Sequence, residues 1–157
     1  MGEACPITIS VEADDFDVAA DTALLSKGRH DVGAISSFIG LCRDEAGGLK
    51  ALELEHYPGM AEAELRRIAE EAAQRWPLRG IVIRHRYGVI APGAQIVAVI
   101  CASSHRAAAL AATDFIMDFL KSRAPFWKKE HGHQASEKGW VDAREADEVA
   151  LARWGER

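Results

Sequence analysis

The segment from Gln95 to Cys101 constrains the fold more than any other part of this sequence. It reads QIVAVIC, an almost unbroken apolar run that contains several β-branched residues. A run of this kind is typical of a central β-strand that is covered on both of its faces. The segment therefore predicts a sheet whose centre is buried on two sides.

The segments around this strand predict an α+β fold. Alternating apolar and polar residues indicate strands over 7–11, 49–57 and 81–87, and β-branched and aromatic residues indicate another over 33–42. Residues 126–141 are expected to be irregular or a short strand. Helices are expected over 17–27, with Asp17 as the N-cap, and over 60–76, 105–122 and 145–154. Strands and helices follow one another without a regular βαβ alternation, so the sheet should be antiparallel or mixed.

Length and composition limit the kind of protein that this can be. A chain of 157 residues is expected to form one domain over 1–157. Its net charge of -5 disfavours a general nucleic-acid coat or a polybasic membrane binder. No apolar run is long enough to span a membrane, and the first residues lack a secretory pattern. Three widely spaced cysteines fit a reducing compartment, so a cytoplasmic protein is expected.

Positive charge gathers between His105 and Lys129. This stretch contains five Lys or Arg and two Asp, a net charge of +3, so the remainder of the chain must sum to -8. A basic region in an acidic protein suits an anionic small molecule or an acidic partner tail. The alternative is an ordinary solvated helix end, where Lys and Arg offset the helix dipole.

Lys121 lies at the border of the apolar face of the helix expected over 105–122. On a helical wheel it falls beside Met117 and Leu110. A lysine at such a border can extend its ammonium into solvent without any further role. It can equally lie in a partly desolvated pocket, where it loses its proton more easily and can act as a base or nucleophile.

Arg106 and Lys121 lie at opposite ends of that same helix. Fifteen residues at 1.5 Å each separate them by about 22 Å. One small ligand cannot contact both in a single chain. If both serve one pocket, the second residue must come from another subunit, which predicts a homodimer with composite sites.

Other candidate groups are weaker. His131 and His133 lack further metal ligands nearby and are better explained as loop residues. Phe126 and Trp127 could stack on a flat heterocycle beside Lys128, although packing in the core is the default for aromatic side chains.

Several longer strings resemble one family, the catalytic large subunits of molybdopterin synthase. They are LEHYPGM (54–60), RHRYGVIAPGAQIVAVICASSHR (84–106), DFIMDFLKSRAPFWKKE (114–130), the FxGxxR stretch 38–43 and the WVxARE pattern at 140–145. The resemblance covers about residues 8–154. It implies an α/β hammerhead fold with an added antiparallel β subdomain, and a homodimer that carries a small ubiquitin-like subunit at each end, forming a heterotetramer.

The resemblance also implies a function. The small partner would end in Gly-Gly with a C-terminal thiocarboxylate as the sulfur donor. Two sulfurs would be transferred to cyclic pyranopterin monophosphate to give the dithiolene of molybdopterin. By motif position, Lys121 and Lys128 correspond to two pocket lysines with catalytic roles. Substrate-binding or site-lining positions correspond to Arg43, His105, Arg106, Met117, Glu130 and Arg144. No metal or other cofactor is implied.

Two details and two alternatives accompany this interpretation. Cys42 stands where an aliphatic residue is expected, and it fits a small core residue better than a reactive thiol. A non-catalytic module that binds a ubiquitin-like partner would keep the partner groove but lose the pocket charges. A nucleic-acid or phosphopeptide binder is disfavoured by the acidic remainder of the chain.

Overall fold

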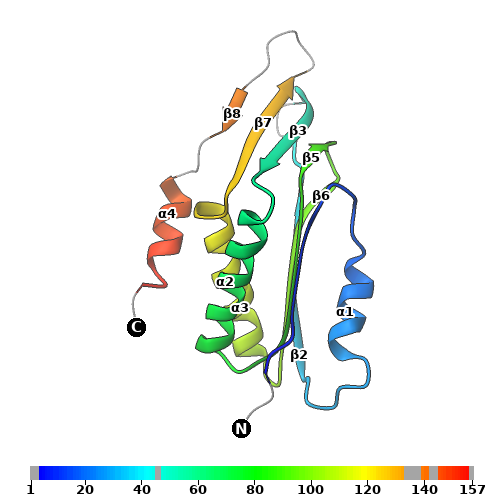
Figure 1. Cartoon of the computed structure of the whole chain (residues 1–157), viewed down its shortest axis with the longest axis vertical. Coiled ribbons are helices and arrows are strands. Elements are labelled where there is room, and N and C mark those ends of the chain that lie inside the picture. The colour runs from blue at the N-terminus through cyan, green and yellow to red at the C-terminus, as the bar shows by residue number, and fades with distance from the viewer. Residues whose placement is uncertain (1–3, 45–46, 133–138, 142–144, 156–157) are drawn as a thin grey trace.

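The computed structural model describes residues 4–44, 47–132, 139–141 and 145–155, which form two sheets and the helices around them (Figure 1). The strands are β1 (Ile7–Glu12), β2 (Ala34–Leu41), β3 (Leu49–His56), β4 (Leu78–Arg86), β5 (Gly88–Ile90), β6 (Gln95–Ser103), β7 (Phe126–Gly132) and β8 (Gly139–Val141). The helices are α1 (Val18–Ser26), α2 (Met60–Arg75), α3 (Arg106–Ser122) and α4 (Glu145–Ala152). The predicted α+β class is confirmed.

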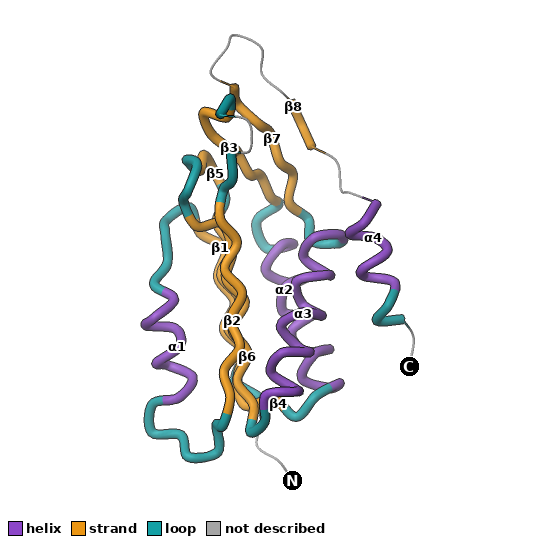
Figure 2. The backbone as a smooth tube through the Cα atoms, turned by 180° about the vertical axis from the view of Figure 1, so that it is seen from behind, coloured by secondary structure: helices purple, strands orange, loops and turns teal. Residues whose placement is uncertain are grey.

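The first sheet has the strand order β1-β4-β6-β2 and is mixed. β1 runs parallel to β4, whereas β6 is antiparallel to both of its neighbours. Figure 2 shows this sheet on edge, with α1 on one face and α2 and α3 on the other. Residues 97–103 of β6 are all buried, as the apolar run predicts.

Two apolar clusters fill the layers on either side of the first sheet. Ile81 and Ile83 of β4 pack with α2 and α3, as their alternation predicts. Val82 lies in the opposite cluster, beneath α1, so β4 is buried on both faces and not on one only. The α1 helix begins at the expected cap, because the Asp17 side chain accepts a hydrogen bond from the Ala20 N–H at 3.1 Å.

The second sheet has the order β5-β3-β7-β8 and is antiparallel throughout. It lies at one end of the first sheet (Figure 1). β7 is a seven-residue strand that pairs with β3, where the sequence predicts only irregular structure or a short strand. The charged segment FWKKEHG shows no clear alternation, because most of its residues are half-buried.

Candidate active site

Lys121 lies in the last turn of α3 and lines an open pocket of about 370 Å³ between α3 and β2. Leu110 and Met117 line the same pocket, so the three residues share one wall, as the helical wheel predicts. Lys121 itself is exposed and Met117 is buried. The remaining lining residues are Ser36, Ser37, Phe38, Thr113, Asp114 and Asp118.

Lys128 lies on a different element from Lys121. It is half-buried on β7, opposite Leu54 of β3. Both lysines lie close enough to His85 of β4 to lower the pKa of its imidazole electrostatically. The two predicted catalytic lysines therefore come from different elements, one from a helix and one from the second sheet.

His85 is the residue that sequence reasoning missed. Its ring stacks on Phe126 with centroids 3.7 Å apart and an interplanar angle of 11°. Burial first, and then the charges of Lys128, His56 and Lys121, lower the pKa of His85 to about 4. A signal was present in the alternation of β4, which places His85 on the apolar face with Ile81 and Ile83.

The proton of this neutral ring has a defined position. The Nδ1 atom of His85 lies 2.8 Å from the carbonyl oxygen of Arg86, and a carbonyl can only accept a hydrogen bond. Nδ1 therefore carries the proton and donates a hydrogen bond to the backbone carbonyl of Arg86. The neutral imidazole adds no positive charge to this part of the molecule.

The aromatic pair that precedes Lys128 is divided between two environments. Phe126 stacks on His85 and also lies against the His56 ring, at a centroid distance of 5.9 Å. Trp127 is 45% exposed and contacts the edge of Tyr57. Packing therefore explains Phe126, whereas Trp127 remains at the surface.

Arg43 and Glu130 lie toward the second sheet. Arg43 follows Cys42, whose backbone N–H donates to the carbonyl of Ala94 at 2.8 Å and whose thiol is close enough to Glu130 to interact electrostatically. Cys42 is only 3% exposed, and burial raises the pKa of its thiol. The interpretation of Cys42 as a small core residue is therefore favoured over a reactive thiol.

His105 and Arg106 lie at the opposite end of α3 from Lys121, and both are exposed. The structure does not bring them to the pocket of their own chain, in agreement with the separation expected along a helix. Arg144, the remaining predicted binding residue, and His133 lie outside the described residues.

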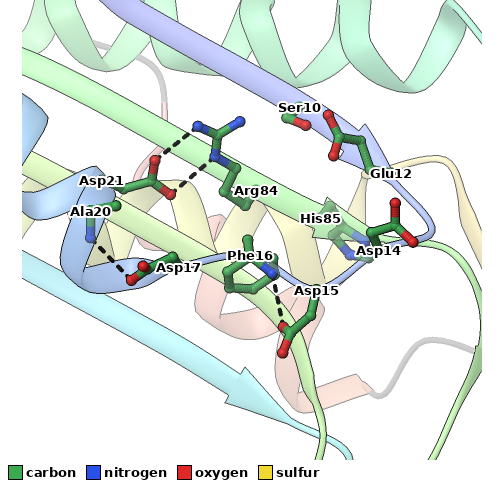
Figure 3. Close-up of a pocket in the computed structure, with 10 residues that line it drawn as sticks. All are labelled: Ser10, Glu12, Asp14, Asp15, Phe16, Asp17, Ala20, Asp21, Arg84 and His85. Atoms are coloured by element: carbon green, nitrogen blue, oxygen red, sulfur yellow. Dashed lines mark hydrogen bonds and ion pairs between the residues drawn. The ribbon is translucent and has the colours of Figure 1, made fainter.

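A second pocket, of about 260 Å³, lies between α1 and the ends of β1 and β4 (Figure 3). Five carboxylates line it, together with a single guanidinium, that of Arg84. Arg84 is held by both oxygens of Asp21, at 2.8 and 3.0 Å. Because carboxylates dominate this wall, an anionic substrate would be repelled there.

Two broader features apply to the described residues only. No helix among them is long and apolar enough to cross a membrane. In the same part of the chain, no group of three or more His, Cys, Asp or Glu side chains is arranged to hold a metal ion.

Comparison with known proteins identifies the family. The family model described as "MoaE protein" matches residues 11–123. A protein of Mesorhizobium japonicum named molybdopterin synthase catalytic subunit is 62% identical, over 94% of this chain and 92% of its own length.

Solved structures agree with that assignment. The molybdopterin biosynthesis MoaE protein of Burkholderia ambifaria is 47% identical and superposes with a TM-score of 0.81, over 96% of this chain and 99% of that one. A structure of molybdopterin synthase from Staphylococcus aureus, 26% identical, gives a TM-score of 0.73 over 90% of this chain and 99% of that one. The chain therefore belongs to the MoaE family, the catalytic subunits of molybdopterin synthase.

Proposed function

We propose that this protein transfers two sulfurs, each from the C-terminal thiocarboxylate of a small ubiquitin-like subunit, to cyclic pyranopterin monophosphate, forming the dithiolene of molybdopterin. Membership of the family supports the reaction type. The observation that carries the proposal is the open pocket beside α3, which Lys121 and Met117 line at the positions that the family resemblance implies. Both lysines can attract an anionic tail and hold it in place.

The two lysines have different roles in this proposal. Each sulfur transfer passes through an acyl intermediate that joins the tail to the pterin side chain, so protons must move and negative charge develops. Lys121, at the wall of the pocket, acts as general acid and base. Lys128, half-buried on β7, stabilises the developing charge.

The phosphorylated substrate requires further positive groups. Arg43, Arg106 and Arg144 supply guanidinium groups, which suit phosphate because their planar N–H donors match its oxygens. His105 lies next to Arg106, at the start of α3. Met117 and Glu130 complete the lining of the site.

Arg106 reaches this site only from a second copy of the chain. A twofold axis across α3 would place Arg106 of the partner subunit beside Lys121. The edge strand β2 offers a surface for this contact, because Phe38, Ile39 and Leu41 are 40%, 41% and 55% exposed. We therefore infer a homodimer, with a small subunit bound at each of its two sites.

The relatives' name, catalytic subunit, implies a second kind of subunit, and the sulfur carrier fits that place. Residues 1–157 would act as one functional domain, and the reaction would take place in the cytoplasm.

Reconstitution tests this function. The purified chain is mixed with a thiocarboxylated small subunit and cyclic pyranopterin monophosphate, and formation of the dithiolene product is followed. Lys121→Ala should abolish product formation and Lys128→Ala should slow it by about 100-fold or more, because general acid–base groups contribute that much. The matched control is Lys27→Ala, an exposed lysine that follows α1 on the other side of the first sheet.

Two outcomes would contradict the proposal. Near-normal turnover by Lys121→Ala would remove the assigned role of that lysine. Tight binding of the small subunit with no product from the wild-type chain would instead favour a non-catalytic binding module.

A further inference from the structure

The segment that follows α4 is joined to the wall of the Lys121 pocket. Arg153 donates from Nη2 to Asp114 at 2.6 Å and to Asp118 at 2.8 Å, and from Nε to Asp118 at 3.1 Å. The indole N–H of Trp154 also donates to Asp118, at 2.5 Å. One carboxylate oxygen of Asp118, Oδ2, accepts all three of the bonds made to that residue.

This arrangement is held in place by packing. The Arg153 guanidinium lies over the Trp154 ring, 4.7 Å from its centroid. Trp154 in turn makes edge contacts with Trp76 and Phe115, at 5.7 and 5.6 Å. The Asp118 side chain is only 15% exposed as a result. Its carboxylate is therefore fixed toward Arg153 and Trp154.

Asp118 and Lys121 are neighbours on the surface of α3. They are three residues apart on one helix, a spacing at which a carboxylate and an ammonium commonly pair. Both line the same pocket. Yet Lys121 forms no ion pair within the described part of the chain, because Asp118 is engaged on its other side.

We propose that Arg153 and Trp154 are positioning residues for Lys121, which hold Asp118 away so that the ammonium of Lys121 stays available to the anionic substrate and tail. This inference rests on the proposed function, in which Lys121 acts on the reacting groups. The charges of Asp114, Asp118, Lys121 and Arg153 sum to zero, and without Arg153 the same wall carries -1. Removing Arg153 both frees Asp118 to pair with Lys121 and makes the pocket less attractive to anions.

A rescue experiment separates this role from a merely structural one. Arg153→Gln should lower kcat/KM for the reconstituted reaction by about tenfold, equivalent to about 1.4 kcal/mol of transition-state stabilisation. Adding Asp118→Asn to Arg153→Gln should restore kcat/KM to within about threefold of wild type, because the competing carboxylate is then neutral. If Arg153 only attached α4, a second substitution in its binding partner could not restore activity.

A matched control comes from an ion pair between α4 and the residue that follows α3. Arg123 donates to Glu148 of α4 at 2.8 Å, and neither residue lines the pocket. Arg123→Gln should leave kcat/KM unchanged. All rates are compared with an active wild-type complex, so an inactive wild type would refute the proposed function and not this role.

Three results would contradict the positioning role of Arg153 and Trp154. Arg153→Gln with wild-type kcat/KM would show that Asp118 does not compete for Lys121. A double variant no more active than Arg153→Gln would show that the loss comes from detachment of α4. A loss of the same size in Arg123→Gln would lead to that conclusion as well.

Discussion

At the scale of single residues, the unusual group is His85, a buried imidazole that stacks on Phe126 and also lines the pocket rich in carboxylates. Burial stabilises its neutral form and outweighs the hydrogen bond from Nδ1 to the Arg86 carbonyl, which by itself raises the pKa. In the unfolded chain the same imidazole would titrate near its ordinary pKa of 6.5, whereas in the fold its pKa is about 4. The unfolded state therefore binds a proton between these two values that the folded state does not bind.

This difference predicts a pH-dependent stability that belongs to His85. Its contribution to the free energy of unfolding is fully present above pH 6.5 and is lost as the pH falls toward 4, by roughly 3 kcal/mol. His85→Phe retains an aromatic ring against Phe126 but cannot titrate. In urea unfolding between pH 7 and pH 4.5, the free energy of unfolding of wild type should fall relative to that of His85→Phe as the pH decreases.

The control for that experiment is His30→Gln, which removes an exposed histidine. It should follow the wild-type pH dependence. Parallel curves for wild type and His85→Phe would show that His85 is not the group responsible.

At the scale of elements, the start of α3 is placed by a close backbone contact. The Gly33 N–H donates to the carbonyl of Ser103 at 3.0 Å, and the Ser104 hydroxyl donates to the carbonyl of Asp31 at 2.9 Å. A Cβ atom on Gly33 would lie 2.2 Å from the backbone oxygen of Ser104. Only glycine allows the two segments to meet this closely, and Arg106 begins α3 two residues after Ser104.

Gly33→Ala should therefore move these segments apart. The expected loss in the free energy of unfolding is about 1 to 3 kcal/mol, the usual cost of overpacking against a backbone that must shift. Chemical denaturation measures this loss. Gly48→Ala is the matched control, because no atom lies within 4 Å of the added Cβ, and its effect should stay within about 0.5 kcal/mol. Equal stability of the two variants would contradict the close contact.

At the scale of the whole molecule, α3 spans the distance between two groups of site residues. Arg106 begins the helix and Lys121 lies in its last turn, about 22 Å away. A site that needs both is complete only where two chains meet. The proposed homodimer would then be a requirement of the chemistry.

Mixed dimers test this requirement. A dimer with Arg106→Ala on one chain and Lys121→Ala on the other contains one intact composite site and one site that lacks both groups. Purified through two different tags, it should retain about half of the wild-type activity, whereas the Lys121→Ala homodimer should have none. Sites contained within single chains would leave the mixed dimer without any intact site and would show the composite arrangement to be wrong.

The sequence by itself determined the features that depend on local periodicity. The apolar run at 95–101 predicted the buried β6, and helical spacing placed Lys121 on one wall with Leu110 and Met117. Asp17 was recognisable as a cap because its hydrogen bond reaches only three residues along the chain. Such patterns report which face of an element is covered, since backbone geometry fixes the direction of each side chain.

Only the tertiary structure decided which distant groups meet. The stacking of His85 on Phe126 joins residues of different sheets, and the contact of Arg153 with Asp118 joins residues 35 positions apart. The pairing of β7 with β3 was likewise not predictable, because the charged segment that forms β7 shows no alternation of apolar and polar residues. Periodicity contains no information about partners, because a buried face can be covered by any apolar surface of the right shape, and the choice depends on the packing of the whole chain.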